Sequence, residues 1–295
     1  MDIYKMILNK LIKGQIRKPG KDAVNESEEL LKGPVKTIKG NIPLQPYDNL
    51  VNLNTCGVIK EAVGEKALAE IANELLDLLG TSIAIYEKNG DYAYGIFASG
   101  WCRLLDLASW KLCGTENNRE ALACGKWHCH ESCWTTAKLS IETGQPVDRE
   151  CEGGIHLYAV PIRAGEQIIG SINFGYGNPP QDPGKINEIA KKYNLSPEEL
   201  LKEAQSYESR PPSVISIAKR HIVTLAHLVG DIVVRKEAEK RLQEKERELS
   251  IRNQIANIFL TVPDDKMYDE VLQIILETMK SKYGLFGYIS NSRRG

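Results

Sequence analysis

The sequence contains no run of apolar residues long enough to cross a bilayer, which takes about 18 to 20 of them. The nearest candidate, residues 222–234, is short and is interrupted by Asp231. The N-terminus, MDIYKMILNKLIKGQIRKPGK, has charges spread among its apolar residues and lacks the apolar core of a signal peptide. We therefore expect a cytoplasmic protein that has no membrane partner.

An excess of charge of either sign is also missing. The 38 Lys and Arg residues nearly balance the 39 Asp and Glu residues, so the composition does not favour a nucleic acid as the partner. Common catalytic motifs are absent as well: there is no GxSxG, no P-loop, no HExxH and no dinucleotide-binding fingerprint. The acidic residues of the central region, Asp106 among them, are scattered, and we expect them to be solvated. These absences favour a protein that is not an enzyme.

The order of the elements that are present predicts an α+β fold. Apolar residues in 58–80 recur with the spacing of an amphipathic helix, which ends at Gly80. Two antiparallel hairpins are predicted at 81–97 and 155–177, the first around an Asn-Gly pair. Short helices are expected between the hairpins, the last of them ended by Gly144. An antiparallel sheet with inserted helices has a PAS-like outline, in which sheet and helices enclose a ligand cavity.

The C-terminal third is predicted to be helical. One long helix is expected over 213–258, and Leu242 and Leu249 lie one heptad apart in it, with Leu228 two heptads earlier. This spacing favours a dimeric coiled coil, although a lone solvated helix fits the many charges of the segment too. A further amphipathic helix and the start of a strand at 285–290 follow. A strand without a partner indicates a fragment or a truncated gene product.

Cysteine is concentrated in the region between the two hairpins. Six of the seven cysteines lie there, and CGKWHCHESCW (residues 124–134) holds three of them. Without an export signal we expect thiols rather than disulfides. Cys129 and Cys133 would lie on one face of a helix, about 6 Å apart. If the hairpins pack side by side, Cys102 and Cys151 could meet this pair.

Three interpretations of the cysteines stay open. They could bind zinc or an iron-sulfur cluster, line a cavity as small buried apolar side chains, or undergo reversible thiol oxidation. The spacing is weak evidence for a metal, because no CxxC pair occurs. A thiol-dependent enzyme is a further alternative, with Cys129 as nucleophile and His130 or His156 as base. The additional metal-ligand candidates are Cys113, Cys124, His128, His130 and His156.

All four tryptophans lie in the same central region as these cysteines. They can be ordinary core residues, yet tryptophans beside so many cysteines are typical of a lined pocket. The tryptophans are Trp101, Trp110, Trp127 and Trp134.

Several stretches of the sequence resemble one known family. SGWCRLLDLAS, CHESCW, ETGQPVDRECEGGIHLYAVPIRAGEQIIGSINFGYG and YESRPP are similar to the PocR-type sensory domain of bacterial and archaeal sensor histidine kinases, over roughly residues 40–235. The positions that match the family's pattern are Cys102, Cys129, Cys151, Gly153, Pro161 and Ile162. The segment that begins NIFLTVPDDKMYDEV resembles the opening of a GAF domain, and the charged helix before it resembles a signalling helix. No kinase motif follows, so kinase activity is not implied.

The resemblance implies a sensory module of a two-component system, in which a small organic ligand binds between the second hairpin and the helical insert. A Cys-ligated zinc or iron-sulfur redox sensor is the alternative. We expect an N-terminal helix and linker (1–40), a sensory domain (41–212), a signalling helix that forms a homodimer (213–258) and a truncated GAF-like start (259–295). The expected ligand-binding residues are Trp101, Cys102, Trp134, Gly153, Gly154, Tyr158 and Asn173. The expected metal ligands are Cys102, Cys129, Cys133 and Cys151.

Overall fold

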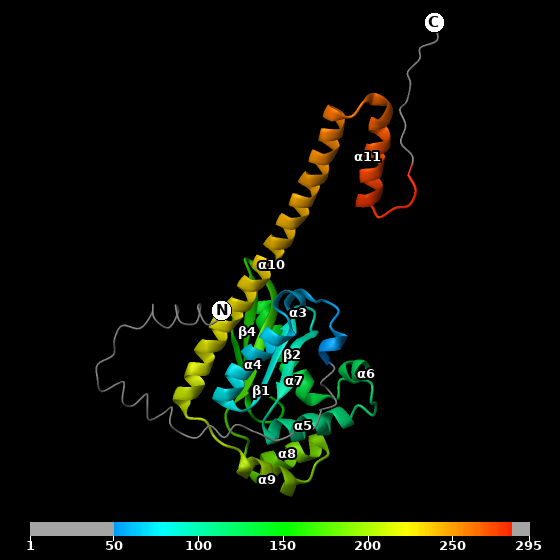
Figure 1. Cartoon of the computed structure of the whole chain (residues 1–295). Coiled ribbons are helices and arrows are strands. Elements are labelled where there is room, and N and C mark those ends of the chain that lie inside the picture. Colours follow the sequence, from blue (N-terminus) through cyan, green and yellow to red (C-terminus); the bar gives the residue numbers. More distant parts are fainter. Residues whose placement is uncertain (1–49, 285–295) are drawn as a thin grey trace, which may run out of the picture. The chain divides into compact units, whose positions relative to one another are not determined.

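A computed structural model describes residues 50–284 of the chain, and one antiparallel sheet forms its centre (Figure 1). The sheet has the order β2-β1-β5-β4-β3. Its strands are β1 (Ser82–Glu87), β2 (Tyr92–Phe97), β3 (Val147–Glu150), β4 (His156–Ala164) and β5 (Gln167–Tyr176). Because β1 pairs with β5, the two predicted hairpins do lie side by side. Strand β3, a short and mostly exposed edge strand, was not predicted.

Helices inserted between β2 and β3 cover one face of the sheet. They are α5 (Gly100–Lys111), α6 (Asn118–Ala123) and α7 (His128–Thr143). Helix α5 begins where the Ser99 hydroxyl accepts a hydrogen bond from the Cys102 amide, and α7 ends at Gly144, whose φ of 66° suits a glycine. Helix α7 contacts β4 and β5 directly, and α5 packs on α7. The predicted α+β class with inserted helices is confirmed.

The opposite face of the sheet is covered by α3 (Val58–Val63), α4 (Glu65–Leu79) and the first half of α10 (Pro212–Thr261). The single helix predicted over 58–80 is in fact two helices, because Gly64 adopts a φ of 83° between them. The end predicted at Gly80 is confirmed. The apolar residues of α10 that are buried here are Ala218, Ile222, Leu225, Ala226, Val229 and Val233.

Two hydrophobic cores result, one on each face, because side chains alternate along the strands. On β1, Ala84 and Tyr86 belong to the core beneath α5 and α7, whereas Ile83 and Ile85 belong to the core beneath α4 and α10. The first of these cores contains the cysteine-rich region.

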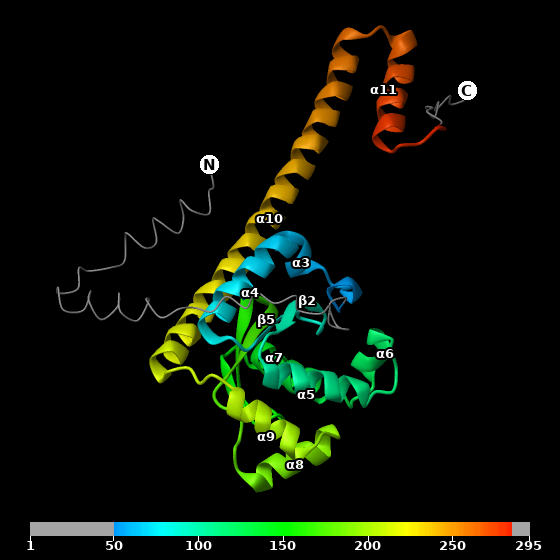
Figure 2. The same cartoon turned by 60° about the horizontal axis from the view of Figure 1, so that its bottom comes forward.

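Two short helices follow the sheet and pack against α5 (Figure 2). They are α8 (Pro183–Tyr193) and α9 (Pro197–Ser206). The side chains of Asp182 and Ser196 cap them by accepting hydrogen bonds from the amides of Lys185 and Glu199. A 3₁₀ turn, η1 (Leu50–Leu53), precedes α3 and contacts β2.

Helix α10 confirms the long helix predicted over 213–258. In its second half Leu242 and Leu249 are 59% and 57% exposed, so both leucines are available for a partner helix. The last described helix, α11 (Asp264–Thr278), packs on the end of α10, where Ile258 and Val271 are buried. Among the described residues no helix has both the length and the apolar character needed to span a membrane. The segments predicted at 1–40 and 285–290 lie outside the described residues.

Candidate ligand-binding site

A small cavity lies where α5, α7, α8 and the sheet meet. The four cysteines predicted to bind a metal line this cavity. Cys102 comes from α5, Cys129 and Cys133 from α7, and Cys151 from the loop before β4. Its volume is about 30 Å³, whereas one water needs at least about 10 to 15 Å³. The complete lining is Ser82, Phe97, Trp101, Cys102, Leu105, Cys129, Ser132, Cys133, Cys151, Gly153, Ile155, Leu157 and Tyr193.

The cavity thiols are protonated near neutral pH. Burial raises the pKa of Cys102 to about 12. Burial also raises the pKa of Cys129 and Cys133 well above the usual value, and the neighbouring thiols and Asp106 add to the effect. The pKa of Cys151 is raised by burial as well. Because the thiolate is the nucleophile, this environment disfavours nucleophilic chemistry at these cysteines.

The described residues contain no group of three or more His, Cys, Asp or Glu side chains placed to hold a metal ion. The expected zinc or iron-sulfur site therefore stays a prediction. What the structure brings together is a set of four neutral, weakly polar side chains around a space of a few atoms.

Trp101 and Gly153 hold the loop of residues 151–155 against α5. The Trp101 Nε1 atom donates a hydrogen bond to the Gly153 carbonyl oxygen at 3.1 Å. A Cβ atom at Gly153 would lie 2.6 Å from the Leu105 side chain, so only a glycine fits there without displacement. Both residues line the cavity, and their role in ligand binding stays a prediction.

Other predicted ligand-binding residues do not line this cavity. Asn173 is buried, and its Nδ2 atom donates to the Cys133 carbonyl oxygen at 3.1 Å, which fastens α7 to β5. Trp134 packs on Tyr86, with ring centroids 5.5 Å apart. Gly154 has a φ of 81° and turns the loop. Tyr158, expected to face inwards, lies on the opposite face of the sheet, because Cβ atoms alternate along β4.

The histidines of the region do not support a catalytic Cys–His pair. His130 is buried, and its Nδ1 atom lies 2.9 Å from the Tyr92 hydroxyl. Burial lowers the pKa of His130 to about 4, so its side chain is neutral. His156 is the first residue of β4, and its Nδ1 atom lies 3.4 Å from Asp148. Each histidine thus has its own partner away from Cys129.

Asp106 corrects the expectation that the acidic residues of this region are solvated. It is fully buried, and its Oδ1 atom accepts a hydrogen bond from the Trp127 indole at 2.7 Å. This contact ties the residue before α7 to α5 and so positions the helix turn that carries Cys129. Nothing in the sequence distinguishes Asp106 from its solvated neighbours.

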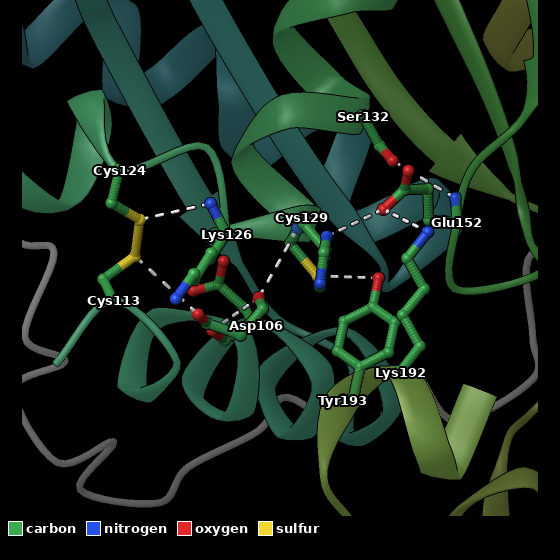
Figure 3. A network of polar contacts seen from close by, with 11 residues as sticks. Asp106, Cys113, Cys124, Lys126, Cys129, Ser132, Glu152, Lys192 and Tyr193 are labelled. Carbon is green, nitrogen blue, oxygen red and sulfur yellow. Dashed lines mark hydrogen bonds and ion pairs between the residues drawn. A yellow bond between two sulfur atoms is a disulfide. The ribbon is translucent and has the colours of Figure 1, made fainter.

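Two cysteines form a disulfide, contrary to the expectation that all seven are thiols. Cys113 and Cys124 are bonded to each other across the segment that contains α6 (Figure 3). The Cys124 sulfur also accepts a hydrogen bond from the Lys126 amide at 3.2 Å. The sequence could not reveal this pair, because the pairing depends on how the segment folds back on itself. The disulfide removes both cysteines from the metal-ligand candidates.

Tyr193 is a cavity residue that the sequence did not predict. It is the last residue of α8, it is buried, and its hydroxyl lies 3.9 Å from the Cys129 sulfur (Figure 3). The only available signal was its place on the apolar face of an amphipathic helix, with Ile186, Ile189 and Ala190. That pattern predicts burial but not the site to which the side chain points.

The comparison with protein families agrees with this geometry. Residues 61–233 match the model described as the sensory domain found in PocR. The chain belongs to this family. The match spans every residue that lines the cavity and extends into α10, so the first half of that helix is part of the PocR domain. A search of curated proteins and a search of solved structures each gave no match.

Proposed function

We propose that the protein is the small-molecule sensory module of a two-component signal-transduction protein and that its ligand binds in the thiol-lined cavity. The observation that supports this proposal best is the convergence of Trp101 and four cysteines on one small cavity within a PocR domain. The module itself catalyses nothing in this proposal. It acts in the cytoplasm, with neither nucleic acid nor membrane as a partner.

The lining favours a small uncharged organic ligand, such as a short alcohol or diol. Among the described residues no charged side chain lines the cavity, and its thiols are protonated. A charged ligand would lose its hydration here without gaining a counter-ion, which is costly. Ser82 and Ser132 are the hydroxyl-bearing residues of the lining besides Tyr193.

The signal would pass from the cavity to α10 through β4 and its neighbours. Leu157 of β4 lines the cavity on one face, while the same strand packs against α10 on the other. At the sheet edge, Lys219 of α10 forms an ion pair with Asp148 of β3 at 2.5 Å. We expect the strands and α10 to have two arrangements. A ligand shifts the protein towards the arrangement that it binds more tightly, and the shift is as large as the difference between the two affinities.

We further propose that α10 forms a homodimeric coiled coil, passes into a GAF domain and serves a histidine kinase. Exposed Leu242 and Leu249, one heptad apart, support the coiled coil. Sedimentation velocity should show a dimer that becomes a monomer when both leucines are replaced by Ser. The matched control is Leu201→Ser, which changes an exposed leucine of α9. A wild-type monomer at high concentration would contradict the dimer.

A metal or cluster redox sensor is the second candidate, and the four cysteines around one cavity favour it. Elemental analysis for zinc and iron and a visible absorption spectrum of protein purified under reducing conditions test it. Metal-free protein that keeps its fold would exclude this candidate and leave the organic-ligand sensor in place.

A thermal-shift screen of short alcohols, diols and aromatic acids tests the main proposal. A ligand at about 100 times its Kd stabilises the folded protein by about 2.7 kcal/mol. We expect a neutral hit whose effect is lost in the double variant Cys129→Ser, Cys133→Ser. Cys56→Ser is the control, because Cys56 lies outside the cavity. Unchanged binding to the double variant would show that the site is elsewhere.

A further inference from the structure

A second hollow lies next to the thiol cavity, on the outer side of α5. It is a surface groove of about 400 Å³ between α5 and the end of α8. Its lining is mostly apolar and consists of Leu104, Leu107, Ala108, Lys111, Leu112, Tyr193, Asn194, Leu195 and Glu199. Tyr193 is the one residue common to this lining and to that of the cavity.

Tyr193 therefore forms the wall between the two hollows. The residue is 1% exposed, and its hydroxyl lies 3.9 Å from the Cys129 sulfur on the cavity side. Its ring meets the His128 ring edge-on, with centroids 5.4 Å apart.

The end of α8 that carries Tyr193 is held by a small ionic cluster centred on Glu152 (Figure 3). Glu152 pairs with Lys192 at 2.9 Å and with His128 at 3.1 Å. The Glu152 amide donates to the Ser132 hydroxyl at 3.2 Å. Partly exposed ion pairs contribute little to stability, so this cluster can open at small cost. Helix α8 ends directly after Tyr193, at Asn194, whose φ is 53°.

We propose that the groove is the entrance to the cavity and that Tyr193 is its gate. The cavity has room for about two waters, so it accommodates a diol or a similar small uncharged molecule only after the Tyr193 ring moves. The apolar side chains of the groove contact the carbon atoms of the ligand. When the Tyr193 ring is displaced, groove and cavity become one site. The nature of the ligand rests on the proposed function, whereas the gate does not.

The gate can be tested without knowing the ligand, by the rate at which a small neutral thiol reagent reaches Cys129. Methyl methanethiosulfonate is added to the full chain at one fixed alkaline pH, and peptide mass spectrometry follows Cys129, with Cys56 as internal reference. We expect Tyr193→Ala to accelerate Cys129 modification by about tenfold or more, because a closed state no longer has to open. Tyr193→Phe keeps the ring and should remain within about twofold of the wild type.

A matched control separates gating from general loosening of the region. Leu200→Ala removes a buried side chain of α9 that lines neither hollow, so it should leave the ratio of Cys129 to Cys56 rates unchanged. If Leu200→Ala accelerates Cys129 as much as Tyr193→Ala does, the proposal is wrong.

Two further variants keep the proposal testable should Tyr193→Ala fail to fold. Leu107→Trp fills the groove and should slow modification of Cys129 but not of Cys56. Lys192→Ala should accelerate Cys129, while Lys185→Ala, which removes a similar α8 ion pair with Glu150, should not. If Leu107→Trp leaves the rate of Cys129 modification unchanged, the groove is not the entrance to the cavity. If the variants behave as expected but the thermal-shift screen finds no ligand, the proposed ligand class is wrong and the gate still stands.

Discussion

Acidification should destabilise the protein through His130, whose side chain is 6% exposed. Tyr86 donates a hydrogen bond to the Tyr92 hydroxyl at 2.9 Å, and that hydroxyl lies 2.9 Å from His130 Nδ1. This chain makes Nδ1 the acceptor of a neutral imidazole. A protonated His130 would be a charged group removed from water. Burial therefore lowers the pKa of His130 from 6.5 to about 4.

The size and sign of the effect follow from the two pKa values. The unfolded chain binds a proton at its ordinary pKa of 6.5, whereas the folded protein binds it only near 4. Stability is therefore complete above the unfolded value and is lost as the pH falls towards 4. The loss between about pH 7 and about pH 5 is about 2 kcal/mol. For a domain of this size, Tm should fall by roughly 4 to 8 °C.

The assay compares urea unfolding of the wild type and His130→Gln across this pH range. On acidification the free energy of unfolding of the variant should fall by about 2 kcal/mol less than that of the wild type. His156→Gln is the control, since His156 is an exposed residue at the start of β4. Burial raises the pKa of Asp91 and Asp148, but the hydrogen bonds that they accept together outweigh it and lower both pKa values below 3.8, so their contribution appears only at more acidic pH. Parallel profiles for the wild type and His130→Gln would refute the argument.

Two other predictions concern the packing of α10 and the disulfide. A Cβ atom at Gly230 would lie 1.8 Å from the Arg163 carbonyl oxygen, so Gly230→Ala should destabilise the protein by about 1 to 3 kcal/mol; thermal unfolding equal to the wild type would contradict this close approach. Cys113 and Cys124 are 11 residues apart, so replacing both by Ser should cost about 3 kcal/mol. Thiol titration of the unreduced, denatured wild type should find five free cysteines, and seven would contradict the disulfide.

Much of the secondary structure was predictable because local signals determine it. Gly80 and Gly144 end helices with left-handed backbone, as predicted. The two hairpins form where period-two patterns flank turn residues. Gly64 shows the limit of such signals: the apolar pattern continues across it, and a backbone φ of 83° still breaks the helix. Periodicity reports which face is buried but not the dihedral angle of one glycine.

The candidate site was predictable only in part. From the sequence, Cys102 and Cys151 could meet Cys129 and Cys133 if the two hairpins packed side by side; the hairpins do pair, and all four cysteines line one cavity. Tyr158 was misplaced, because a shift of one position along a strand moves a side chain to the other face of the sheet.

The sequence by itself determined the α+β class, the paired hairpins, the long helix and membership of the PocR family, because these depend on local patterns and on motifs within short stretches. Only the tertiary structure decided which side chains share a cavity. Tyr193 reaches Cys129 from 64 residues away, and Trp127, the residue before α7, reaches Asp106 of α5. Such contacts depend on how α8 and α7 dock on α5, and docking is the sum of many weak packing interactions that no single stretch of sequence encodes.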